Sequence, residues 1–117
     1  MPELPEVETP RRGVEPHCLN RTVERVKVRD ARLRWPVPDT LPTVLRGQVI
    51  TAVERRGKYL LFRTSTGSLL VHLGMSGSLR VVAPTDTPGR HDHIDLLLDG
   101  GACLRYHDPR RFGSFLW

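Results

Sequence analysis

The chain has 117 residues, enough for one domain with a buried core. Apolar residues make up 38% of it and charged residues 26%, a composition typical of a folded globular protein rather than a disordered one. No apolar run approaches the roughly 20 residues that cross a bilayer, and no basic stretch precedes a hydrophobic one at the start. We therefore expect a cytoplasmic protein with no membrane partner.

The charge is strongly basic, with 18 lysines and arginines against 13 acidic residues and a net charge of +5. Lys27 and Lys58 are the only lysines, so the other 16 (18 − 2) are arginines. Arginine forks match phosphate oxygens, which favours a nucleic-acid surface, although a solvated basic surface without a partner fits the charge equally well. Cys18 and Cys103 lack the spacing of metal ligands, so we expect two buried or unused thiols and no metal site in this chain.

The first part of the chain predicts helical pieces around one strand. Residues 5–18 read as a short helix. Acidic residues such as Glu8 suit the positive N-terminal end of the helix dipole, whereas the internal prolines Pro10 and Pro16 weaken the helix. Residues 22–28 read as a strand, a basic loop leads to Trp35, and residues 41–46 read as one or two helical turns.

The rest of the chain predicts β-structure. Short runs rich in apolar and β-branched residues are separated by turn sequences at 65–67 and 99–101. This spacing favours a mainly β fold, an antiparallel β-sandwich or pseudobarrel flanked by two short helices, over alternating βαβ units. Two further segments, 72–78 and 108–117, read as loops that the core does not need. The expected strands cover residues 49–56, 58–64, 68–73, 78–82, 93–98 and 102–108.

The first residues suggest a reactive amine. If Met1 is removed, Pro2 becomes a secondary α-amine, and with a pKa near 8 roughly a tenth of such an amine is neutral at pH 7. Attack on a sugar C1′ would give an iminium ion, an electron sink that permits elimination at the neighbouring carbons. Glu3 could protonate the sugar ring oxygen, and Glu6 could support the site's geometry. With Met1 attached, the Pro2 nitrogen is a tertiary amide and cannot attack; the same residues also fit an ordinary helix start.

Six motifs in order along the chain resemble the formamidopyrimidine-DNA glycosylase family: PELPEVET, RRGVEPH, RRGKYLL, HLGMSGSLR, HDH and DPRRFG. The resemblance implies that residues 1–117 form the N-terminal catalytic domain of an enzyme of base-excision DNA repair. Such an enzyme removes oxidised purines, 8-oxoguanine and formamidopyrimidines, from double-stranded DNA. It then cleaves the abasic strand by β,δ-elimination.

The resemblance also implies residue roles. Pro2 corresponds to the nucleophile and Glu3 to the catalytic acid, while Lys58 corresponds to the lysine that contacts the DNA backbone and assists elimination. His72 and His91 correspond to positions near the phosphates that flank the lesion.

A second set of residues resembles the family's void-filling group. Extruding a nucleotide leaves a gap in the base stack that the enzyme must fill. Met75 and Phe112 correspond to the apolar wedges, and Arg110 to the arginine that binds DNA by pairing with the orphaned base. Without the resemblance, Met75 and Phe112 would read as core residues.

The family's second domain, with a helix–two-turn–helix motif and a zinc finger, has no counterpart in this sequence. We therefore expect no cofactor in this chain, a structural zinc only in that other domain, and weak or absent activity of these residues alone. Full-length members are expected to be monomeric. Apolar residues 115–117 suggest that this chain self-associates.

Three other functions stay open. An endonuclease VIII-type glycosylase, which acts on oxidised pyrimidines, also uses an N-terminal proline, although PELPE and DPRRFG favour the purine branch. A non-catalytic module that binds damaged DNA is the second. A basic β-domain that binds RNA or protein would explain the charge but not Pro2 and Glu3 beside the void-filling group.

Overall fold

The computed structural model describes residues 5–117, except the side chain of Glu6. Pro2 and Glu3 lie outside the described residues, as does the predicted supporting role of the Glu6 side chain. The described chain forms, in order, α1 (Pro5–Cys18), β1 (Val23–Val28), α2 (Leu41–Leu45), β2 (Ala52–Arg56), β3 (Tyr59–Arg63), β4 (Ser68–His72), β5 (Ser78–Val82), β6 (Asp92–Leu98), β7 (Cys103–His107) and β8 (Ser114–Leu116).

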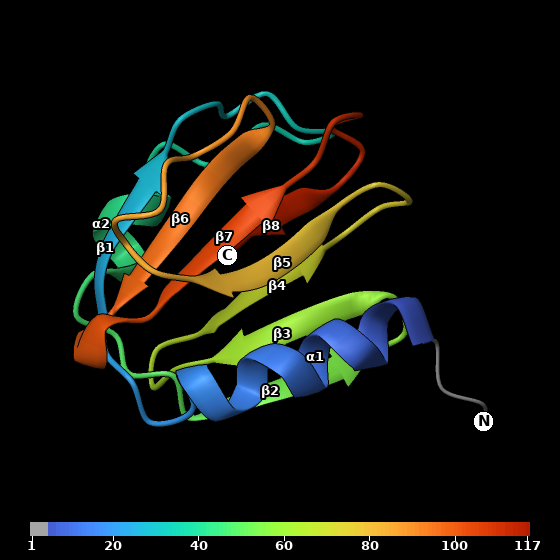
Figure 1. The fold of residues 1–117 in the computed structure, drawn as a ribbon. Helices are drawn as coiled ribbons and strands as arrows, with labels where there is room; N and C mark the ends of the chain where they lie inside the picture. Colours follow the sequence, from blue (N-terminus) through green and yellow to red (C-terminus); the bar gives the residue numbers. More distant parts are fainter. Residues whose placement is uncertain (1–4) are drawn as a thin grey trace.

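The strands form two antiparallel sheets of four, in the orders β1-β6-β7-β5 and β2-β3-β4-β8. The sheets face each other, α1 packs against β2, β3 and β5, and α2 packs against β1 (Figure 1). This arrangement confirms the predicted β-sandwich with two flanking helices.

The core lies between the sheets and beneath the helices. Inward side chains such as Phe62 of β3 and Leu104 of β7 are almost fully buried, and their removal from water is the main stabilising contribution. Tyr106 of β7 and Phe115 of β8 meet edge to face with ring centroids 4.9 Å apart, so one aromatic pair joins the two sheets.

The prediction for residues 108–117 is wrong in part. Ser114–Leu116 forms β8, which pairs with β4, and Phe115 is only 1% exposed. Leu73, in the other predicted loop, is also a core residue at 4% exposure. The expected apolar end surface is correspondingly smaller, because Phe115 is inside while Trp117 is 39% exposed.

The remaining elements follow the predictions with small shifts. The helix over residues 5–18 has the predicted bounds despite Pro10 and Pro16. Val49 falls outside β2 and pairs with Thr22 only as an isolated bridge. Both cysteines are free and buried, as expected, and burial raises the pKa of Cys18 to about 12 and that of Cys103 to about 11. Within the described residues, no helix is long and apolar enough to cross a membrane.

Candidate nucleic-acid interface

A pocket of about 290 Å³ lies beside the first turn of α1. Val7 of α1 lines it together with Lys58 from the β2–β3 turn, His72 at the end of β4 and Met75 from the β4–β5 loop. The turn and this loop lie on the same side of the molecule as the start of α1, at the right of Figure 1. The fold therefore brings three of the predicted site residues to one place.

His72 presents a neutral imidazole at this pocket. The backbone N–H of Gly74 donates a 3.1 Å hydrogen bond to Nδ1 of His72, which leaves Nε2 as the protonated nitrogen. Burial lowers the pKa of His72, and the charges of Lys58 and Arg34 lower it further. A neutral Nε2–H beside a lysine is a suitable donor pair for a phosphate oxygen.

The two predicted wedge residues are exposed rather than in the core. Met75 is 89% exposed and Phe112 is 49% exposed. The guanidinium carbon of Arg110 lies 5.9 Å from the centroid of the Phe112 ring, within the range of a cation–π contact. Their exposure excludes the core alternative and leaves both side chains accessible to a partner, as the void-filling role requires.

Asp108 holds the loops that carry these side chains. Its carboxylate accepts hydrogen bonds from the hydroxyls of Ser76 and Tyr106, both at 2.6 Å. It also accepts the backbone N–H groups of Arg110 at 3.2 Å and Gly113 at 2.9 Å. Asp108 is fully buried, and although burial raises its pKa, the hydrogen bonds led by that of Ser76 outweigh burial and lower it. One carboxylate therefore ties the β4–β5 loop to the β7–β8 loop.

Two glycines allow these loops to approach closely. A Cβ on Gly113 would lie 1.8 Å from the hydroxyl oxygen of Tyr106, and a Cβ on Gly77 would lie 2.0 Å from the carbonyl oxygen of Leu73. Both distances are impossible for a side chain. Gly77 and Gly113 are thus required by the close packing of the two loops around Tyr106, which hydrogen-bonds to Asp108.

His91 lies apart from the pocket that Lys58 and His72 line. Its ring meets those of His93 and His107 edge to face, with centroids 6.2 Å and 5.9 Å away. Its Nδ1 is buried and has no hydrogen-bond partner within the described chain. Its carbonyl accepts the backbone N–H of Asp108 at 3.0 Å, which connects it to the loop of Arg110.

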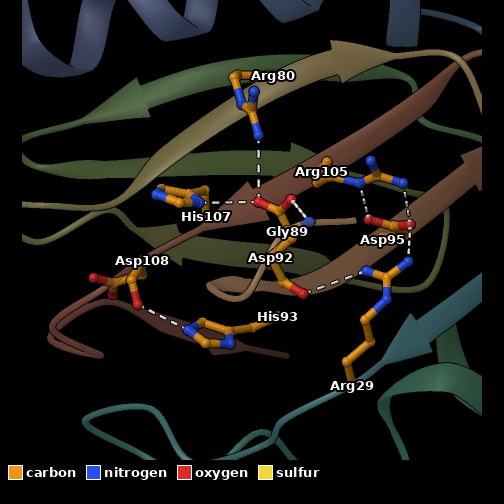
Figure 2. A network of polar contacts seen from close by, with 9 residues as sticks. All are labelled: Arg29, Arg80, Gly89, Asp92, His93, Asp95, Arg105, His107 and Asp108. Atoms are coloured by element: carbon orange, nitrogen blue, oxygen red, sulfur yellow. Dashed lines mark hydrogen bonds and ion pairs between the residues drawn. The ribbon is translucent and has the colours of Figure 1, made fainter. Parts of the chain in front are cut away.

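A polar network supports this corner of the sheet, as Figure 2 shows. Asp92 accepts hydrogen bonds from the backbone N–H of Gly89 at 2.6 Å and from Arg80 at 3.3 Å, and it lies 2.9 Å from Nδ1 of His107. Nε2 of His93 lies 2.8 Å from the carbonyl oxygen of Asp108. The segment before β6 is thereby fixed to β5 and β7.

Beside it lies a buried ion cluster. Arg105 forms two hydrogen bonds with Asp95, at 3.0 and 3.1 Å, and Arg29 of the segment after β1 forms another at 2.5 Å (Figure 2). Burial raises the pKa of Asp95, but hydrogen bonds from Arg29 and Arg105 outweigh it and lower the pKa to about 2. Asp95 and Arg105 stabilise the sheet and are not accessible to a ligand, because they are only 3% and 2% exposed.

A second cluster holds α1 in place. Glu8 accepts hydrogen bonds from Arg11 at 2.7 Å and Arg12 at 2.8 Å and lies 3.6 Å from Nε of Arg55 in β2. The hydrogen bond from Arg11 is the largest influence lowering the pKa of Glu8, which falls to about 2. The start of α1 is therefore anchored to the β2–β3 hairpin that carries Lys58.

Sequence reasoning missed Asp108 and Ser76. An Asp-Pro pair predicts only a turn, and nothing in the local pattern shows that Ser76 reaches it. Among the described residues, no group of three or more histidine, cysteine and acidic side chains could hold a metal ion.

Comparison with known proteins agrees with the fold and motifs. The family model of the formamidopyrimidine-DNA glycosylase N-terminal domain matches residues 1–115. The chain therefore belongs to the formamidopyrimidine-DNA glycosylase family and corresponds to its N-terminal domain.

Individual relatives show the extent of the match. The chain is 62% identical over 117 residues to the formamidopyrimidine-DNA glycosylase of Stutzerimonas stutzeri and 59% identical to that of Methylococcus capsulatus. It spans 43% of the length of each of these relatives.

Solved structures give the same picture. The Lactococcus lactis enzyme bound non-covalently to DNA with an abasic site has a TM-score of 0.87 and 32% identity, over 97% of this chain and 44% of that one. A complex of the same bacterium's enzyme with DNA containing FAPY-dG has a TM-score of 0.87 and 31% identity, over 97% of this chain and 43% of that one.

Proposed function

We propose that this chain is the catalytic N-terminal part of a DNA glycosylase and abasic-site lyase that removes oxidised purines during base-excision repair. The observation that carries the proposal is the pocket beside the start of α1, where Lys58, His72 and Met75 meet. Two phosphate-binding groups and an exposed apolar wedge in one place suit a nucleotide extruded from a duplex.

The proposed chemistry begins at the N-terminus. Pro2 precedes the start of α1 by three residues, so covalent geometry limits its amine to about 11 Å from Pro5. The secondary amine attacks C1′ of the sugar and displaces the base, which leaves with the amine proton. Glu3 protonates the ring oxygen as its bond to C1′ breaks, and an iminium ion forms. Proton loss at C2′ then expels the 3′ phosphate, and a second elimination expels the 5′ phosphate. Lys58 would contact the backbone phosphate during these steps.

The lesion class rests on the relatives. Among the complexes of similar proteins, one contains FAPY-dG and another contains carbocyclic 8-oxo-G. Both ligands are modified purines, which favours the purine branch over an endonuclease VIII-type substrate. Because the relatives are more than twice as long and phosphate contacts supply much of the affinity, we expect these 117 residues alone to react slowly. A structural zinc in the remainder of such proteins stays a prediction.

Borohydride trapping on a duplex with one abasic site tests the proposal. The amine condenses with the sugar aldehyde and releases water, and hydride from borohydride reduces the resulting iminium to a stable amine. We expect a covalent complex from protein that lacks Met1 by intact mass, and none from protein that retains it, which is the matched control. Binding without a covalent complex in either form would indicate the non-catalytic module instead. Parallel duplexes with 8-oxoguanine and an oxidised pyrimidine separate the two glycosylase types.

A further inference from the structure

A second hollow of about 370 Å³ adjoins the pocket, since His72 lines both. It is lined by Arg34, Trp35, Tyr59, His72, Phe112 and Ser114. Three aromatic side chains reach it from three separate parts of the chain: the loop after β1, strand β3 and the β7–β8 loop. The proposed glycosylase chemistry uses neither Trp35 nor Arg34.

Trp35 is presented on an anchored loop. The indole is 58% exposed, whereas Leu33 and Val37 on either side of it are 7% and 3% exposed. The backbone N–H of Val37 donates to the carbonyl of Ala31 at 2.9 Å, which closes the loop on itself. The backbone that carries the exposed indole is therefore held in place by its buried neighbours.

The same loop is bonded to the loop of Phe112. The backbone N–H of Arg34 donates to the carbonyl of Gly113 at 3.2 Å. Arg111 donates to the carbonyl of Arg32 at 3.2 Å and pairs with Asp30 at 2.7 Å. Trp35 and Phe112 thus face one hollow from two loops that are held together.

The remaining lining is aromatic and basic. Tyr59 is 37% exposed and its ring meets that of His72 edge to face, with centroids 5.1 Å apart. Arg34 contributes a guanidinium at the rim. Among the described residues that line the hollow, none carries a carboxylate. This combination of flat apolar faces and one cation matches a nucleobase with its phosphate better than a peptide or a free anion.

We propose that this groove binds one unpaired nucleobase of DNA, stacked on Trp35, with its phosphate paired to Arg34. The inference rests on the proposed function in that it takes DNA as the ligand. It adds a site for a base outside the double helix, beside the pocket of Lys58 and Met75 and sharing His72 with it. Stacking is tolerant of sequence because every base has a π-face.

The test compares two DNA probes on the same protein. A labelled single strand of about ten nucleotides reports the groove, and a fully paired duplex with one abasic site reports the proposed function. We expect Trp35→Ala to weaken single-strand binding about 5- to 150-fold, the range for removal of one stacked base, and to leave abasic-duplex binding unchanged. Trp35→Phe is the matched control and should keep most of the single-strand affinity.

Two results would overturn the groove proposal: single-strand binding unaffected by Trp35→Ala, or equal losses on both probes. Failure of the unchanged protein to bind the abasic duplex would instead count against the proposed function. Thermal unfolding of each variant shows whether it folds. A Trp117→Phe background leaves Trp35 as the only tryptophan, so quenching of its fluorescence by the single strand gives a direct second readout of stacking.

Discussion

The Ser76 hydroxyl donates a 2.6 Å hydrogen bond to Oδ1 of Asp108, a residue 32 positions further along the chain. The bond joins the loop that carries Met75 to the loop that carries Arg110 and Phe112. A fixed separation between these loops is what a void-filling role requires, because both must enter one gap in the base stack.

Ser76→Ala should loosen this coupling. A hydrogen bond to a charged group contributes about 1.5–3 kcal/mol, so we expect unfolding to become easier by roughly that amount and base extrusion to fall several-fold. Denaturant unfolding measures the first effect, and the fluorescence of a 2-aminopurine beside the lesion measures the second. Ser65→Ala, in the exposed β3–β4 turn, is the control and should change neither. Unaltered fluorescence with Ser76→Ala would refute the coupling.

Alanine substitutions of Met75 and Leu73, which lie close together in the β4–β5 loop, should differ in their effect on stability. Met75 is 89% exposed, so Met75→Ala should leave stability unchanged and lower base extrusion. Leu73 is 4% exposed in the core, so Leu73→Ala should cost about 2–5 kcal/mol of unfolding free energy. Thermal unfolding and 2-aminopurine fluorescence on both variants distinguish the two. Substantial destabilisation by Met75→Ala would show that it packs as a core residue.

The two lysines form a matched pair for testing phosphate binding. Lys58 lines the pocket, whereas Lys27 is exposed on β1. Removing one lysine that binds a phosphate should reduce the magnitude of the slope of log affinity against log salt concentration by about one. We therefore expect Lys58→Ala to weaken binding to an abasic duplex and flatten the salt dependence, and Lys27→Ala to do neither. Equal effects of both substitutions would mean that Lys58 contributes only to the general positive field.

Acid should destabilise the sheet through Asp95. Its folded pKa of about 2 lies below the unfolded value of 3.8, so its stabilising contribution is complete above pH 4 and is lost as the pH falls toward 2. Asp95→Asn should cost about 3 kcal/mol at pH 7, because it leaves Arg105 buried without its partner charge. It should also flatten the decline in stability below pH 4.

The control for Asp95 is an exposed ion pair on the other sheet. Glu54 pairs with Arg63 but its side chain is 45% exposed, so Glu54→Gln should cost less than about 1 kcal/mol. Urea unfolding at pH 7 and at acid pH compares the two variants. A cost for Asp95→Asn no larger than that of Glu54→Gln would contradict the buried-cluster interpretation.

Much of the fold follows from local patterns in the sequence. The helix over residues 5–18 and the strand at 78–82 have the predicted bounds, because turn residues and short apolar patterns act over a few positions. The motifs also identify the family without any structure. Ser114–Leu116 was missed because a three-residue strand has too little pattern to stand out and forms only when β4 provides its partner.

The sequence by itself determined which reactive and binding groups the chain carries. These are the Pro2 amine beside the Glu3 carboxylate, Lys58 in a turn, and the apolar Met75 and aromatic Phe112 in segments that contain glycine. The tertiary structure decided which of these meet. Lys58, His72 and Met75 share a pocket, Asp108 accepts hydrogen bonds from two loops, and Trp35 and Phe112 line one groove. The physical reason is that hydrogen bonds and pockets between distant segments depend on sheet pairing, which local propensity does not encode.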